Sequence, residues 1–263
     1  MNEPQKSGVE PDEWASLRTY TKARIALGKT GVSVPLKESL AFKLAHAHAK
    51  DAVYSQLQID DLQAKLAPAG LPIHVLHSQA SSRDIYLQRP DFGRRLDDTS
   101  VKLLNQLQSP SADICIIVAD GLSATAVMRN AGLVVRRLIE KAQLASYSLA
   151  PILLVEQGRV AITDAIGDLL RPKLAVILIG ERPGLSSFDS LGAYLTYAPK
   201  SGLTDERRNC ISNIREEGLK PSQAADKIMH LIQAAFRLQL TGIALKEDDG
   251  LDGADTYREI EEA

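Results

Sequence analysis

The sequence predicts an α/β fold: an open, doubly wound and mostly parallel sheet of the Rossmann-like type, preceded by a helical N-terminal segment. Two observations predict it. After residue 70, short apolar runs rich in β-branched residues alternate with amphipathic helical stretches, and the strongest of these runs have no polar face. Strands that are covered by crossover helices on both faces have this pattern. The 263 residues suffice for one large domain or two small ones.

The N-terminal part of the chain is expected to be helical. A short helix should begin near Asp12, and after Pro35 leucine and alanine recur at helical spacing until the Pro68–Gly70 turn ends the pattern. This spacing predicts one helix, or a pair of helices, with one apolar side. We assign residues 1–70 to an N-terminal tail and helical segment.

The rest of the chain alternates between strands and helices. The expected strands are residues 73–76, 113–119, 151–155, 174–179 and 191–197. The expected helices are residues 99–107, 123–145, 161–170 and 222–240. This alternation predicts a domain over residues 71–246 with right-handed crossovers, followed by an acidic C-terminal tail over residues 247–263.

Charge and composition exclude several classes of protein. Eight acids and one base give the tail a charge of −7, so residues 1–246 carry +5 within a total of −2. A weakly basic body is compatible with a phosphate-bearing ligand, but a nucleic-acid binder would have a strongly basic stripe. No apolar run approaches the roughly 20 residues of a membrane span, and the polar start has no secretory signal. Two cysteines in unrelated contexts are typical of the reducing cytoplasm.

Three predicted strands end in polar loops that contain glycine, at residues 120–126, 156–160 and 180–186. Ligands of open α/β sheets bind beyond the carboxyl ends of the strands, where these loops should meet. Ser123 or Thr125 opens a helix whose free N–H groups can bind an oxygen. The alternative is that each loop is only a tight turn with a capping residue.

A polar segment at residues 204–213 holds Cys210 next to Arg207 and Arg208. Nearby positive charge lowers the pKa of a thiol, so a nucleophilic cysteine is an alternative. Such catalysis needs a base, however, and the nearest histidine, His230, lies on an expected helix. Neither a metal site nor a phosphate-binding glycine loop is predicted, because the histidine and glycine spacings are wrong for both.

Six segments carry a family resemblance that composition and periodicity could not provide. They are residues 24–31 (RIALGKTG), 40–53 (LAFKLAHAHAKDAV), 119–126 (ADGLSATA), 158–164 (GRVAITD), 179–186 (IGERPGLS) and 208–215 (RNCISNIR). Together they resemble the small subunit, or light chain, of ethanolamine ammonia-lyase over roughly residues 20–246.

The resemblance implies a carbon–nitrogen lyase that converts ethanolamine to acetaldehyde and ammonia with adenosylcobalamin. It implies that a TIM-barrel large subunit performs the chemistry and that this chain, without catalytic residues or metal ligands of its own, completes the cofactor site at the interface. Six large and six small subunits would assemble in the cytoplasm or in a bacterial microcompartment. Residues 1–11 lack the amphipathic apolar face associated with encapsulation, which leaves that location open.

Carried over position by position, the family's cobalamin contacts fall on Val160, Glu181 and Cys210. We add Arg159 as a hypothesis, because it adjoins Val160 and can pair with the nucleotide phosphate or with an acid of the large subunit. The Asp-x-His-x-x-Gly signature is absent from the sequence, so the cofactor is expected to keep its own dimethylbenzimidazole on cobalt. The alternatives are a nucleotide- or phosphate-binding α/β module and a purely structural subunit of a larger enzyme.

Overall fold

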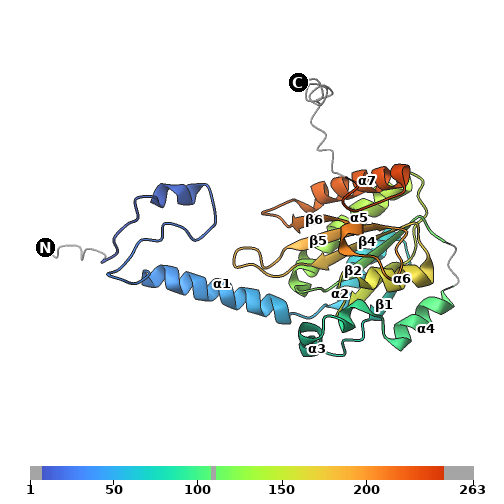
Figure 1. The fold of residues 1–263 in the computed structure, drawn as a ribbon, viewed down its shortest axis with the longest axis horizontal. Coiled ribbons are helices and arrows are strands. Elements are labelled where there is room, and N and C mark those ends of the chain that lie inside the picture. Colours follow the sequence, from blue (N-terminus) through green and yellow to red (C-terminus); the bar gives the residue numbers. More distant parts are fainter. Residues whose placement is uncertain (1–7, 108–110, 246–263) are drawn as a thin grey trace, which may run out of the picture.

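The computed structural model describes residues 8–107 and 111–245, so the acidic tail expected at residues 247–263 lies outside the described residues. The described residues form a six-stranded sheet with helices on both faces, and a helical arm that projects from this body (Figure 1).

The sheet is mixed, with the strand order β1-β3-β2-β4-β5-β6. Four neighbours are parallel, namely β1 (Ile73–His77), β3 (Ile152–Glu156), β2 (Ile114–Ala119) and β4 (Leu174–Gly180). In contrast, β5 (Leu191–Tyr197) is antiparallel to β4, and β6 (Arg208–Ile214) is antiparallel to β5.

The α/β class is therefore confirmed, but a mostly parallel, Rossmann-like sheet is not. The reason lies in the connection between β4 and β5, residues 181–190, which contains no helix. A parallel return needs a crossover of a dozen residues or more, usually helical, so a short loop sends the next strand back antiparallel. In addition, β6 includes the second half of the polar segment at residues 204–213, for which no strand was predicted.

Helices cover the two faces unequally. On one face, α2 (Ile59–Leu66), α5 (Ala124–Leu144) and α7 (Pro221–Leu238) bury apolar side chains against strands β2 to β6. On the other, α4 (Asp98–Gln106) and α6 (Ile162–Leu170) pack on β1 to β4. The predicted helices of the domain thus form, with ends shifted by one or two residues. On this second side, the apolar cluster of the described residues includes Tyr194 of β5 but no residue of β6.

The central parallel strands are buried on both faces, and all four parallel strands end at one edge of the sheet. Every residue of β2 and β4 is buried. The register aligns Ala119, the last residue of β2, with Val155 and Ile179. A helix that was not predicted, α3 (Arg83–Gln88), follows β1 at the same edge. Loops from all four parallel strands therefore meet there.

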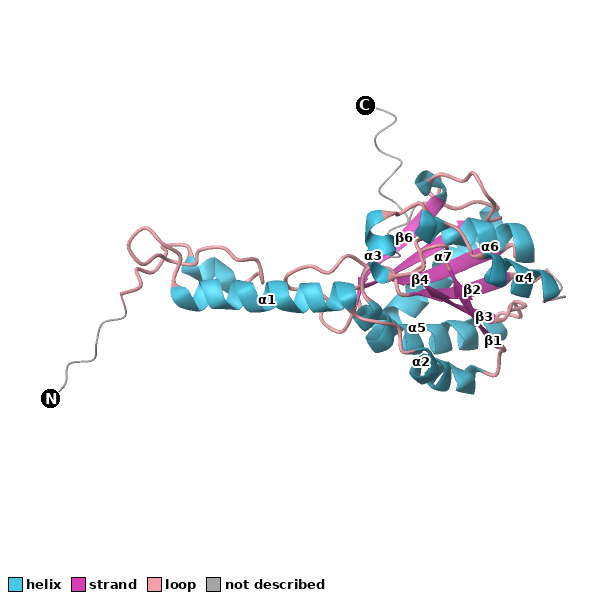
Figure 2. Ribbon diagram, turned by 90° about the horizontal axis from the view of Figure 1, so that it is seen from below, coloured by secondary structure: helices cyan, strands magenta, loops and turns pink. Residues whose placement is uncertain are grey.

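The N-terminal arm leaves this body as a long helix, α1 (Leu36–Tyr54), which Figures 1 and 2 show projecting to one side. The short helix expected from Asp12 is a 3-10 turn, Ala15–Thr19. The apolar side chains in the first half of α1 do not pack on the body, since Leu36, Leu40 and Leu44 are 73%, 54% and 58% exposed. Near the end of the helix, Ala52 is buried. Among the described helices, none combines the length and apolar character that a membrane crossing requires.

Candidate functional site

The strand-end loops are joined to one another by the carboxylate of Asp120, the first residue after β2. Its two oxygens accept the backbone N–H groups of Gln157 (3.0 Å) and Gly158 (3.2 Å), in the loop after β3. The N–H of Leu122 donates to the carbonyl of Gly180 at the end of β4 (2.8 Å). The three loops therefore form one connected rim.

This rim requires a glycine after Asp120. Gly121 has a φ of +56°, and a Cβ on it would lie 2.3 Å from the carbonyl oxygen of Gly180. Positive φ and so close a backbone approach both exclude an ordinary side chain. The close approach of the loop after β2 to the end of β4 thus requires glycine at position 121.

Arg83 of α3 holds the rim through hydrogen bonds and an ion pair. Its guanidinium donates to the carbonyls of Val53 (2.6 Å) and Gly121 (2.8 Å), and it lies 3.9 Å from Asp120. Burial nevertheless raises the pKa of Asp120 to about 6, because desolvation of the carboxylate outweighs the hydrogen bonds and the attraction of Arg83. One arginine thus connects the end of α1 to the loops of the sheet.

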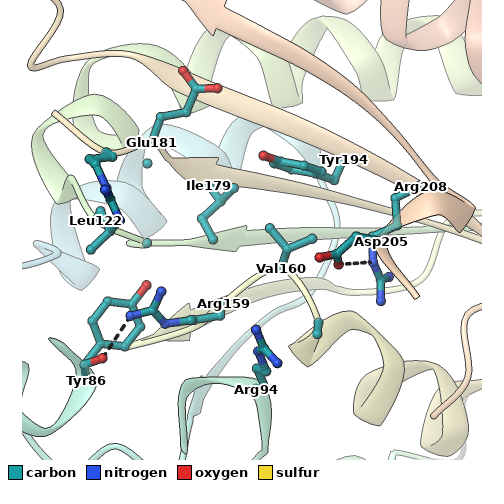
Figure 3. A pocket seen from close by; sticks show the side chains of 14 residues that line it. Tyr86, Arg94, Leu122, Arg159, Val160, Ile179, Glu181, Tyr194, Asp205 and Arg208 are labelled. Atoms are coloured by element: carbon teal, nitrogen blue, oxygen red, sulfur yellow. Dashed lines mark hydrogen bonds and ion pairs between the residues drawn. The ribbon is translucent and has the colours of Figure 1, made fainter. Parts of the chain in front are cut away.

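Tyr86, also on α3, holds the loop that contains Arg159 and Val160. Its hydroxyl donates to the carbonyl of Gly158 (3.1 Å). The guanidinium of Arg159 lies over the Tyr86 ring, 4.5 Å from its centre, and donates to the Tyr86 carbonyl (3.1 Å). Figure 3 shows this side chain running along the rim towards Tyr86. Arg159 is therefore a positioned side chain and not a free loop arginine.

A cavity of about 590 Å³ lies beside this rim. Its wall is apolar in the middle and charged at the edges, as Figure 3 shows. The lining residues are Tyr86, Arg94, Gly121, Leu122, Arg159, Val160, Ala161, Ile179, Gly180, Glu181, Arg182, Tyr194, Asp205 and Arg208. The cavity extends from the ends of the parallel strands to Tyr194 of β5 and Arg208 of β6.

Glu181 lies at the edge of the cavity and is held by its own chain. Its carboxylate accepts hydrogen bonds from the hydroxyls of Ser190 (2.5 Å) and Ser212 (2.6 Å), and from the N–H of Asn213 (3.3 Å). An ionised carboxylate offers about four acceptor positions. One position is therefore left for a ligand, and the orientation of the carboxylate is fixed in advance.

Cys210 lies one strand further on, paired in register with Tyr194 of β5. Desolvation raises the pKa of its thiol, the Glu181 carboxylate raises it further, and a hydrogen bond with Tyr194 opposes them. Arg208, which the nucleophile hypothesis placed beside this thiol, is instead committed to Asp164. This geometry argues against a reactive thiolate and leaves Cys210 as a contact surface.

Arg208, which lines the cavity, forms a buried ion pair. Its guanidinium donates to both carboxylate oxygens of Asp164 on α6 (3.0 and 2.7 Å) and to the hydroxyl of Thr196 (3.1 Å). The pair connects α6, which follows the Val160 loop, to β6, which carries Cys210. It thereby fixes the two sides of the cavity relative to each other.

Three of the four residues predicted for the site, Arg159, Val160 and Glu181, thus line one cavity. Cys210 does not line it but adjoins its wall through Tyr194. Sequence analysis missed Tyr86 and Arg94, which come from the segment after β1. A signal existed, because residues 83–95 contain four arginines and follow a predicted strand whose end belongs to the same edge.

No group of His, Cys, Asp and Glu side chains in residues 8–107 and 111–245 is arranged to hold a metal ion. The lining instead combines an apolar wall, one oriented carboxylate and several guanidinium groups. Such a surface can bind a large molecule that has apolar faces and amide or phosphate groups at its periphery.

Comparison with known proteins identifies the family of the chain. Residues 11–246 match the family described as ethanolamine ammonia-lyase light chain (EutC). A protein of Pseudomonas syringae pv. tomato named ethanolamine ammonia-lyase small subunit is 49% identical over 255 residues, which cover 96% of this chain and 89% of the relative. One of the same name from Xanthomonas campestris pv. campestris is 51% identical over 250 residues, covering 93% and 92%. A third, from Pseudomonas aeruginosa (strain LESB58), is 50% identical over 256 residues, covering 95% and 93%. The chain therefore belongs to the ethanolamine ammonia-lyase light chain family.

Proposed function

We propose that this chain is the small subunit of an adenosylcobalamin-dependent ethanolamine ammonia-lyase and that its cavity forms one side of the cobalamin site. The observation that most supports this is the placement of Val160, Glu181 and Arg159 around one cavity, with Cys210 on the adjoining strand. They come from three separate segments of the sequence, around residues 160, 181 and 210, and the fold brings these segments together.

The residues present fit the chemistry of a corrinoid. Val160, Ile179 and Tyr194 offer apolar surface to a flat macrocycle, and Glu181 can accept an amide N–H from its periphery, a bond worth roughly 1.5–3 kcal/mol. The Nε–H of Arg159 is buried and has no hydrogen-bond partner among the described residues. A buried donor of this kind calls for an acceptor supplied from outside.

The proposed role is binding and orientation. When bound, adenosylcobalamin supplies the radical chemistry of the lyase by homolysis of its cobalt–carbon bond. This chain contributes the apolar wall, the oriented Glu181 carboxylate and the exclusion of water from one face of the cofactor. The chemical steps on ethanolamine then belong to the large subunit, a TIM barrel in the proposed complex of six large and six small subunits.

The arm supports a subunit role. Trp14, Tyr20 and Leu36 are 67%, 87% and 73% exposed. An extended apolar surface of this kind marks an interaction site. It emerges at the edge of the sheet that bears the cavity, because the carbonyl of Val53 accepts from Arg83 and Ser55 accepts the N–H of Thr125 (3.1 Å). A large subunit that covers the cavity would lie within reach of the arm. We place the complex in the cytoplasm. Sedimentation of the lyase together with shell proteins would instead place it in a microcompartment.

The test uses the purified complex of both subunits. Val160→Phe fills the cavity and should weaken adenosylcobalamin binding at least about tenfold, measured from the cofactor's absorbance, while size-exclusion chromatography shows the assembly intact. Leu144→Phe is the matched control, because Leu144 is 86% exposed at the end of α5, outside the cavity. Wild-type cofactor affinity and acetaldehyde production in both Val160→Phe and Cys210→Ala would instead favour a purely structural subunit.

A further inference from the structure

The cavity has an excess of positive charge. Four arginines line it, Arg94, Arg159, Arg182 and Arg208, against two acids, Glu181 and Asp205. Arg208 is neutralised by Asp164 (2.7 Å) and lies 3.6 Å from Asp205, so this pair adds no free charge. Arg94, Arg159 and Arg182 then remain against the two lining carboxylates of Glu181 and Asp205, and Glu181 already accepts three hydrogen bonds from its own chain. An anionic group is therefore the natural ligand of this rim.

The three remaining arginines differ in how they are engaged. Arg159 is stacked on Tyr86 and hydrogen-bonded to it. Arg94 and Arg182 are exposed, and neither side chain has a hydrogen bond or ion pair with the residues that the structure describes. Arg159 therefore offers a ligand only its Nε–H, whereas the whole guanidinium groups of Arg94 and Arg182 have no partner among the described residues.

The backbone that carries Arg94 is held against the loop that contains Arg159 and Val160. Arg94 ends a 3-10 turn, Phe92–Arg94. The carbonyl of Gly93 accepts the N–H of Arg159 (2.8 Å). A Cβ on Gly93 would lie 2.8 Å from the Arg159 side chain and 3.0 Å from the Tyr86 ring. Figure 3 shows the Arg94 side chain at the rim, reaching towards Val160 and across the cavity from Tyr194. Arg94 thus enters the cavity from a rigid base.

The geometry points to Arg94, with Arg182, as the binding site for the phosphodiester of the cofactor's nucleotide arm. This inference rests on the proposed function, because it assumes that the cavity holds a cobalamin. The phosphodiester is the fixed anion on the periphery of that molecule, where the corrin side chains are neutral amides. A guanidinium binds a phosphate through paired N–H donors, which a lysine or an amide cannot reproduce.

The two-subunit complex can be tested with a pair of corrinoids. Adenosylcobinamide keeps the corrin ring and the adenosyl group of adenosylcobalamin but lacks the phosphodiester and its nucleotide. Arg94→Gln should weaken binding of adenosylcobalamin by about 10- to 100-fold and leave that of adenosylcobinamide unchanged. Arg182→Gln should act in the same direction, and Arg94→Lys should restore part of the affinity, because it keeps the charge.

Arg95→Gln provides the matched control. Arg95 is the next residue, is exposed and does not line the cavity, so its replacement should leave both affinities unchanged. An equal loss for both corrinoids in Arg94→Gln would overturn the inference in favour of a structural role, and weaker subunit assembly would favour an ion pair with the large subunit. Unchanged binding in both Arg94→Gln and Arg182→Gln would also overturn it. If the wild-type complex binds neither corrinoid, the proposed function itself fails.

Discussion

The buried pair between Asp164 and Arg208 provides the sharpest test of how the cavity is held together. The Arg208 side chain is 2% exposed and that of Asp164 is 9% exposed. Asp164→Ala would leave the guanidinium buried with only the Thr196 hydroxyl and Asp205, whose own side chain is 95% exposed and lies 3.6 Å away. Removing one partner of a buried pair costs about 3–5 kcal/mol, because the other charge remains uncompensated.

The measurement is unfolding of the full chain by urea, monitored by circular dichroism. The free energies of unfolding are compared between variants whose dependence on urea concentration has the same slope. Asp205→Ala is the control, because it removes an exposed partner of the same arginine and should cost less than about 1 kcal/mol. Replacing both members of the pair, as Asp164→Leu with Arg208→Met, should recover most of the stability lost in Asp164→Ala. The reasoning is refuted if Asp164→Ala costs no more than Asp205→Ala.

Three further outcomes are expected. Burial raises the pKa of Asp120 from 3.8 to about 6, so the folded protein holds this proton more tightly than the unfolded chain does. The free energy of unfolding should therefore fall by up to about 3 kcal/mol as the pH rises from about 4 to 7. Urea unfolding of Asp120→Asn should show a smaller fall with pH, and an equal fall would contradict the assignment. Ser123 caps α5 by accepting the N–H of Ala126 (3.1 Å) and also donates to the carbonyl of Phe188 (2.9 Å). Ser123→Ala should therefore lower the free energy of unfolding by about 1–2 kcal/mol, which a lower melting temperature would show. An unchanged melting temperature would show that the cap contributes nothing. In the proposed complex loaded with adenosylcobalamin, we expect the cofactor to keep its own base, because the sequence lacks the Asp-x-His-x-x-Gly signature. The EPR spectrum of cob(II)alamin should then be unaffected by ¹⁵N-labelling of the protein's histidines, and an altered nitrogen splitting would show histidine ligation.

The central strands could be predicted because both of their faces are buried. Residues such as Ile116 and Val176 lie in continuous apolar runs that only a covered strand tolerates. The helices that cover them followed from periodicity. The direction of β5 could have been predicted as well, since the short loop before it allows no crossover.

The strand β6 was missed for a specific reason. Its two core residues, Ile211 and Ile214, are three positions apart, although their partners Ala193 and Leu191 are two apart. This register shift is a β-bulge, which places one extra residue in the strand and breaks the alternation by which a half-buried strand is recognised. Asn213, within the bulge, has a φ of +58°.

The candidate site could be predicted in its loops but not in its supports. The motifs around Val160 and Glu181 lie at the ends of recognisable strands. Tyr86 donates to Gly158 and Arg83 donates to Gln157, and each partner lies more than 70 positions further along the chain. No local pattern reveals such contacts, because they depend on how β1 joins the edge of the sheet.

The exposed arm has a consequence for the life of the protein before it is assembled. A newly made chain whose body has folded still presents Trp14, Tyr20 and the leucines of α1 to water. Surfaces of this kind promote aggregation and attract chaperones. We therefore expect synthesis of this subunit to be matched to that of its partner, with any surplus chains degraded, so that the abundance of the larger protein limits how much of this one accumulates.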